Sequence, residues 1–129
     1  MTTRVVRLGL PLLVAMAACS KPRPRPVPPS IEFVYDTTQV IQSPGALTGT
    51  VNVHASGGMD FLHLRLATAD SIFVLDTLEG YAGERDITRP IAWEIVPGLA
   101  PGTTLHFTVI ARDFIGFETL DSTRFKTHP

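Results

Sequence analysis

Alternation of apolar and polar residues, interrupted at short intervals by turn-forming residues, constrains the fold of this chain more than any other feature. The longest alternating run contains Leu105, Phe107, Val109 and Ala111. A period of two places successive side chains on opposite faces of a strand, so one face of such a strand is apolar. No helical period of comparable length occurs in the chain. The pattern predicts an all-β fold whose strands turn their apolar faces toward a shared core.

Six further segments have the composition or alternation of strands. They cover residues 31–35, 50–55, 61–66, 72–78, 91–95 and 117–126. Turns are predicted at 56–58, 69–71 and 113–116, and the polar residues 79–89 are predicted to form a loop. About seven short strands within about a hundred residues indicate an antiparallel β-sandwich, which we expect over residues 31–129.

Charge separates the N-terminal segment from the remainder of the chain. Residues 1–29 carry five basic residues and no acidic one, whereas six basic and twelve acidic residues follow, a formal charge of −6 from Ser30 onward. An acidic domain repels phosphate, so nucleic acid is not expected as a partner. The single cysteine, Cys19, excludes a disulfide within the chain and a cysteine-based zinc site.

Residues 1–18 have the pattern of a secretory signal peptide. Arg4 and Arg7 precede an apolar run of eleven residues, 8–18, which ends in small side chains. The run is too short for a transmembrane helix, which needs about twenty apolar residues. A buried N-terminal helix is the alternative interpretation.

Met16-Ala17-Ala18-Cys19 resembles the lipobox of bacterial lipoproteins, although leucine is more usual at the position of Met16. The resemblance implies that the Cys19 thiol carries a diacylglyceryl group and that Cys19 becomes the new N-terminus. Two or more acyl chains anchor a protein stably to a membrane. Ser20, where retained inner-membrane lipoproteins have aspartate, favours the outer membrane of a bacterial cell envelope. Cleavage without lipidation is the alternative.

Residues 19–30 are predicted to be a lipidated cysteine followed by a proline-rich linker. Half of residues 21–30 are proline, which favours an extended polyproline II spacer about 30 Å long. Lys21, Arg23 and Arg25 would each favour anionic headgroups by about 1 kcal/mol. A ligand for a proline-binding domain and a contact with an anionic wall polymer are the alternatives to a spacer.

Two segments near the C-terminus resemble the end of a bacterial immunoglobulin-like or fibronectin type III-like domain. Residues 99–103 match its Leu-x-Pro-Gly-Thr corner, and residues 111–116 match its Ala-x-Asp-x-x-Gly hairpin. The resemblance extends over about residues 31–126 and implies an immunoglobulin-like β-sandwich, but no particular task. Leu105 stands where the corner tyrosine is common, and the cysteine pair and strand-C tryptophan of antibody domains are missing. We therefore expect the corner to depend on Pro101, Gly102 and packing.

Four residues are candidates for metal binding. His54, His63 and His106 lie on the polar faces of predicted strands, and the strands of His63 and His106 would be neighbours in an immunoglobulin-like order. Zinc requires three or four ligands, and no closely spaced histidine pair occurs, so we expect surface histidines and no metal. Asp113 could ligate calcium, but we expect it to accept hydrogen bonds from its own turn.

No catalytic or cofactor-binding residue is predicted. Ser43, Ser56, Ser71 and Ser122 lack a nucleophile elbow, no phosphate-binding loop occurs, and no spacing distinguishes a pair of acids. The remaining candidate surface consists of Phe61, Phe73 and Leu75, which would form an exposed apolar patch unless the loop at 79–89 covers them.

Together these features predict a membrane-anchored envelope lipoprotein that is not an enzyme. Its β-sandwich would be a binding or scaffolding module that contacts an envelope protein or wall polymer through sheet edges or end loops. The alternative is a carbohydrate- or small-ligand-binding accessory domain of an uptake or hydrolase system, with Trp93 as a fluorescent reporter. A small envelope hydrolase is the third possibility.

Overall fold

The computed structural model describes residues 27–129, which form eight strands and no helix. In chain order the strands are β1 (Ser30–Val34), β2 (Ile41–Gln42), β3 (Gly45–His54), β4 (Met59–Thr68), β5 (Val74–Gly80), β6 (Asp86–Ile95), β7 (Thr104–Asp113) and β8 (Glu118–His128). The all-β prediction is confirmed. The additional strand is β2, whose two residues are too few to produce an alternating pattern.

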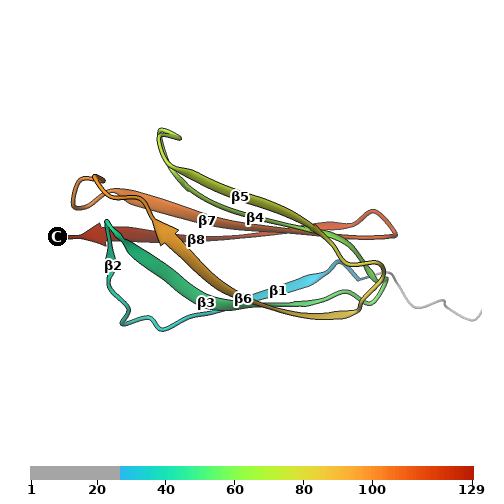
Figure 1. The fold of residues 1–129 in the computed structure, drawn as a ribbon. Helices are drawn as coiled ribbons and strands as arrows, with labels where there is room; N and C mark the ends of the chain where they lie inside the picture. The colour runs from blue at the N-terminus through green and yellow to red at the C-terminus, as the bar shows by residue number, and fades with distance from the viewer. Residues whose placement is uncertain (1–26) are drawn as a thin grey trace, which may run out of the picture.

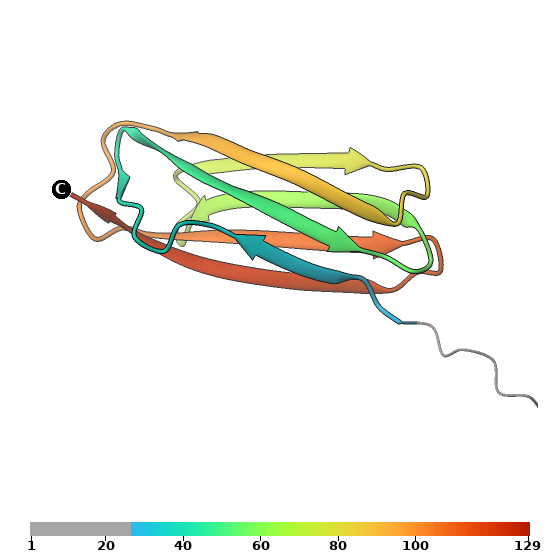
Figure 2. The same ribbon diagram turned by 90° about the horizontal axis from the view of Figure 1, so that it is seen from below.

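Two sheets lie face to face, as Figure 1 shows from one side and Figure 2 from another. One sheet has the order β1-β3-β6 and the other has the order β2-β8-β7-β4-β5. All neighbouring strands are antiparallel except β2 and β8, which are parallel. The expectation of a purely antiparallel arrangement is wrong for this pair. After β1 the chain crosses to the other sheet without reversing, and it then runs in the same direction as β8.

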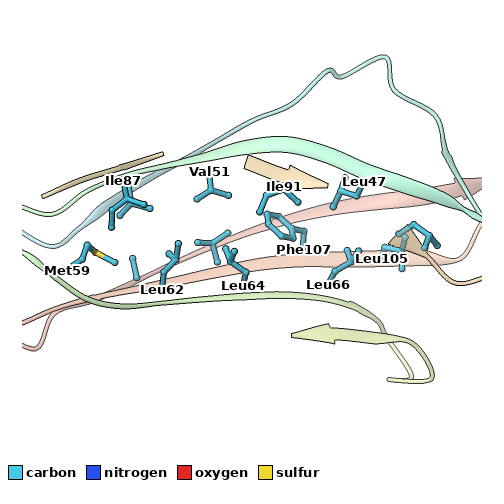
Figure 3. Close-up of a cluster of buried hydrophobic side chains, with 14 of the residues drawn as sticks. Leu47, Val51, Met59, Leu62, Leu64, Leu66, Ile87, Ile91, Leu105 and Phe107 are labelled. Carbon is cyan, nitrogen blue, oxygen red and sulfur yellow. The ribbon is translucent and has the colours of Figure 1, made fainter. Parts of the chain in front are cut away.

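The core lies between the sheets and includes the apolar rows that alternation predicts (Figure 3). It also contains residues outside the predicted rows, namely Ile41, Leu47, Met59, Phe73 and Ile87. Leu62, Leu64 and Leu66 of β4 are completely buried, and Leu105 and Phe107 of β7 are each 1% exposed. Burying a side chain of this size contributes about 1.5–3 kcal/mol relative to leaving it in water. The predicted inward faces of these two central strands are therefore confirmed.

The prediction of a loop over residues 79–89 is wrong. β5 continues to Gly80 and β6 begins at Asp86, so only five residues connect them. This short connection turns through Ala82 and Gly83, which have φ angles of 45° and 88°. Both strands lie at sheet edges, where polar side chains remain accessible, and a polar sequence there does not indicate a loop.

β3 begins five residues earlier than the predicted strand. Its first half includes Gly45 and Gly49, which weaken the alternating signal, although Leu47 between them is 1% exposed. Gly49 leaves room for the ring of Phe33, because a Cβ at residue 49 would lie 2.6 Å from Phe33 Cε2. The glycine therefore permits close packing of an aromatic ring on the backbone.

Thr127 of β8 holds the corner between β6 and β7. Its hydroxyl donates to the carbonyl of Ala100 at 2.9 Å and accepts from the amide of Thr103 at 3.0 Å. Its carbonyl also accepts from the amide of Gly102 at 2.8 Å. Thr127 is only 3% exposed. The expectation that Pro101, Gly102 and packing stabilise the corner is therefore incomplete, because a residue distant in sequence supplies its hydrogen bonds.

Candidate functional site

The proposed lipidation residue, Cys19, lies outside the described residues, together with the signal peptide at 1–18 and the linker up to residue 26. Within residues 27–129, no helix is long and apolar enough to cross a membrane. The described chain enters the sandwich next to β8, where the carbonyl of Pro29 accepts a hydrogen bond from Thr119 Oγ1 at 2.5 Å.

Each of two predicted histidines lies beside an aspartate instead of a second histidine. His54 Nδ1 lies 2.7 Å from Asp86 Oδ1, and His63 Nε2 contacts Asp76. His106 is on β7, and β4 and β7 are neighbours, but His63 pairs with Ile110, four positions from His106. That offset corresponds to about 13 Å along the strands, too far for a shared metal ion. Among residues 27–129, no group of three or more metal-ligating side chains is close enough to hold a metal.

Asp113 accepts hydrogen bonds from its own turn, as predicted. Its Oδ1 lies 2.8 Å from the amide nitrogen of Gly116 and 2.9 Å from that of Phe117. The residue is 1% exposed, and its Oδ2 has no hydrogen-bond partner in the structure. These contacts show that Asp113 stabilises the turn of the β7–β8 hairpin, which is a structural role.

Ser43 has a structural position that the sequence does not indicate. Its hydroxyl donates to the carbonyl of Val96 at 2.5 Å and accepts from the amide of Leu99 at 2.9 Å. It therefore connects the start of β3 to the loop after β6. Ser56, Ser71 and Ser122 are exposed.

Phe61, Phe73 and Leu75 do not form the single patch that the sequence suggests. Phe73 is 9% exposed and belongs to the core, and Leu75 packs against the core from the inner face of β5. Phe61 lies on the outer face of β4, where the guanidinium of Arg112 is 5.9 Å from its ring centroid. Phe61 and Leu75 are thus on opposite faces of one sheet.

The most elaborate arrangement of polar and apolar side chains lies along the β5–β6 side of the sandwich. β5 is the edge of the five-stranded sheet and β6 is the edge of the three-stranded sheet. Each edge strand has one row of backbone groups without a partner in its sheet, which is the feature that strand addition uses. Side chains cover the gap between β5 and β6 in the half nearer the β5–β6 turn, whereas the other half of this side has surface hollows.

An ion pair closes the half nearer the turn. Arg89 Nε lies 3.0 Å from Glu79 Oε1, and Arg89 Nη2 lies 3.1 Å from Glu79 Oε2. The Tyr81 hydroxyl donates to Glu79 Oε1 at 2.8 Å. The hydrogen bond from Arg89 lowers the pKa of Glu79, and burial together with the nearby Glu79 carboxylate raises the pKa of Tyr81 to about 12. Inward-pointing charges of this kind protect sheet edges from adding further strands.

The other half of the β5–β6 side contains two adjoining surface hollows. Leu75 and Glu94 line both of them. Trp93, Asp76 and Arg89 contribute to the first, and apolar residues dominate the second, namely Phe73, Ile95, Val96, Pro44 and Pro97. The Trp93 ring packs edge-on against the buried ring of Phe107, with ring centroids 5.8 Å apart, so the core fixes its orientation. We call this region, lined by Leu75, Trp93, Glu94 and their neighbours, the β5–β6 groove.

The β5–β6 groove combines an oriented aromatic ring, aliphatic surface and charges of both signs. Glu94 offers acceptors beside Trp93, whereas the Asp76 carboxylate already contacts His63 and the Arg89 guanidinium already pairs with Glu79. Such a combination suits an extended polypeptide, which uses backbone hydrogen bonds and side-chain pockets, or a sugar ring, which stacks on an aromatic face. The sequence does not reveal this groove, because its residues belong to edge strands of two different sheets, which only the complete fold brings side by side.

No family model matches the chain, and neither curated proteins nor solved structures include a match.

Proposed function

We propose that this chain is a lipid-anchored envelope protein whose β-sandwich binds a partner without catalysis in the β5–β6 groove. The observation that carries the proposal is the juxtaposition of two unpaired sheet edges with hollows that Trp93, Leu75 and Phe73 line. Edge backbone groups would provide affinity, and the hollows would select side chains. The partner would be an envelope protein or a wall polymer.

We further infer that the domain is immunoglobulin-like, most similar to the fibronectin type III arrangement. The supporting observation is the strand order, in which the first, third and sixth strands form one sheet and the fourth, fifth, seventh and eighth strands belong to the other. The division of the first strand between both sheets, as β1 and β2, agrees with this assignment. The fold supports binding through edges and loops without specifying the ligand.

The proposed location depends on the N-terminal sequence. Met16-Ala17-Ala18-Cys19 is the basis for a lipid on Cys19, and the residue after it favours the outer membrane. Replacing Cys19 with alanine should leave the sandwich folded, because Cys19 lies before the first strand. The protein should nevertheless leave the membrane fraction, or its precursor should remain uncut. Wild-type processing and membrane retention of Cys19→Ala would refute the lipoprotein assignment.

Site-specific photocrosslinking in intact cells tests the groove. A photoreactive amino acid at Ala92, an exposed residue that lines the groove, should form a discrete crosslinked product. The matched position is Ser122, which is exposed on β8, the second strand from the opposite edge of the five-stranded sheet. A product at Ser122 equal to that at Ala92, or no product at Ala92, would contradict binding in the groove.

Carbohydrate binding is the second candidate, and the position of Trp93 beside Asp76 and Glu94 favours it. Oligosaccharides of β-1,4-linked N-acetylglucosamine should then produce a saturable change in Trp93 fluorescence. Asp76→Ala should weaken the response, whereas Asp86→Asn, which alters a carboxylate outside the groove, should leave it unchanged. An unchanged emission spectrum up to millimolar sugar would exclude this candidate. Turnover of the sugar would instead indicate the third candidate, a hydrolase.

A further inference from the structure

One end of the sandwich gathers three loops and the point where the described chain begins. These loops are residues 55–58, 81–85 and 114–117, at the right-hand end of the ribbon in Figure 1 and Figure 2. Backbone hydrogen bonds join them: the amide of Phe114 donates to Gly58, and the amide of Gly83 donates to Met59, at 3.0 and 2.9 Å. The three loops therefore form one connected cap.

The β7–β8 hairpin gives this cap an apolar tip, which we define as Phe114, Ile115 and Phe117. These side chains are 59%, 58% and 36% exposed, respectively. The tip is ordered from within, because the buried Asp113 accepts hydrogen bonds from the amides of Gly116 and Phe117. Three large apolar side chains exposed on a fixed turn have a cost in water that a lipid or protein surface would remove.

The tether begins at the same end. Thr119, which follows the hairpin by two residues, binds the carbonyl of Pro29. Cys19 is ten residues before Pro29, and ten residues reach at most about 36 Å. A lipid on Cys19 would therefore keep this end of the sandwich within about 36 Å of the bilayer.

The charges around the tip are compatible with a membrane surface. Glu118 forms an ion pair with Arg112 at 3.8 Å, and Asp86 Oδ1 lies 2.7 Å from His54 Nδ1. Glu118 is thus partly neutralised within the domain, and in the cap the exposed Arg85 follows the exposed Glu84 in sequence. Three basic residues follow Cys19 in the sequence and favour anionic headgroups. Aromatic and aliphatic side chains at such a tip suit the interface between headgroups and acyl chains.

We propose that the tip is a membrane-docking element, which inserts Phe114, Ile115 and Phe117 into the bilayer that holds the lipid on Cys19. The inference rests on the proposed lipidation of Cys19 and adds a second attachment. Two attachments orient the sandwich, so that the long axis stands on the membrane and the β5–β6 groove runs away from it along the side. The alternative arrangement is a domain that the proline-rich linker holds away from the membrane surface.

Depth-dependent quenching of tryptophan fluorescence tests the docking. Lipidated full-length protein, processed in cells, is reconstituted into vesicles of phosphatidylethanolamine and phosphatidylglycerol that contain phosphatidylcholine brominated on its acyl chains. Phe114→Trp places the reporter in the tip. Ile72→Trp is the matched control, because residue 72 is 80% exposed at the opposite end of the sandwich. Wild-type protein supplies the contribution of Trp93, and circular dichroism verifies that both variants fold.

The expected result is several-fold stronger quenching of Trp at residue 114 than at residue 72. Equal or absent quenching at the two positions, in protein whose lipid on Cys19 is verified by mass spectrometry, would overturn the docking proposal and leave the lipoprotein assignment intact. If mass spectrometry finds no lipid, the lipoprotein assignment fails instead. In that case the same two Trp variants, as soluble proteins, are mixed with the vesicles. Quenching of Trp at residue 114 supports insertion of the tip, and the absence of quenching overturns it.

Discussion

The gap between the two sheets is covered differently on the two sides of the sandwich, by apolar rings on one side and by an ion pair on the other. On the β1–β8 side, aromatic rings fill the gap between the sheets. The centroid of the Phe33 ring lies 4.6 Å from that of Phe107, and the Phe125 ring meets the Phe33 ring edge-on, with centroids 6.3 Å apart. On the β5–β6 side, the Glu79–Arg89 ion pair closes one half and leaves the groove in the other. An apolar closure stabilises the fold and excludes ligands, whereas a polar closure contributes less and leaves a surface that can bind.

The aromatic closure should contribute most to stability. Phe33→Ala removes contacts with Tyr35, Phe107 and Phe125 and should lower the free energy of unfolding by about 3 kcal/mol, near the lower end for a phenylalanine in a core. Urea denaturation measures the change. Phe114→Ala makes the same chemical change at a side chain that is 59% exposed and should cost less than about 0.5 kcal/mol. Equal losses would mean that the aromatic rings do not close this side.

Gly49→Ala should disturb the same closure without removing a ring. The new Cβ would lie 2.6 Å from Phe33 Cε2 and 2.9 Å from the carbonyl oxygen of Val34, so the ring and the backbone must both move. Overpacking of this kind costs about 1–3 kcal/mol. In a Phe33→Ala background the cost should fall by about 1 kcal/mol, because the ring that it displaces is missing. Additive losses in this double-mutant cycle would show that Gly49 and Phe33 are energetically independent.

The difference between the two sides also explains which parts of the fold the sequence predicts. Central strands have buried inner faces, so β7 alternates along its whole length and β4 alternates from Leu62 to Leu66, and both were predictable from these runs. Edge strands do not need an apolar inner face along their whole length. Glu79 and Arg89 face inward on β5 and β6, where their pairing replaces burial, and the sequence therefore resembles a loop.

The same reasoning limits prediction of the candidate site. Asp113 was predictable as a turn residue, because its partners are three and four residues away. The contact of Thr127 with the corner spans 24 to 27 residues, and the groove combines side chains from β5 and β6 with the loop before β3. Such contacts depend on which strands become neighbours, and no local pattern encodes this information.

The polar closure should contribute a smaller, pH-dependent stability. Glu79→Gln should lower the free energy of unfolding by about 1 kcal/mol at neutral pH, because the ion pair is partly exposed but bidentate. Folding lowers the pKa of Glu79 below its ordinary value of 4.5. The unfolded chain therefore binds this proton first as the pH falls. The wild-type advantage should be complete above about pH 5 and should disappear as the pH falls through the lowered pKa.

A matched substitution separates this ion pair from carboxylates in general. Glu118 faces Arg112 at 3.8 Å, with side chains that are 53% and 45% exposed, so Glu118→Gln should change stability by less than about 0.5 kcal/mol at any pH. Urea denaturation of both variants between pH 3 and pH 7 makes the comparison. If Glu79→Gln changes stability as little as Glu118→Gln, the packing of Tyr81 would close that half of the side without the charge. The charge of the ion pair would then not contribute to the difference in stability between the β5–β6 side and the β1–β8 side, and only packing would.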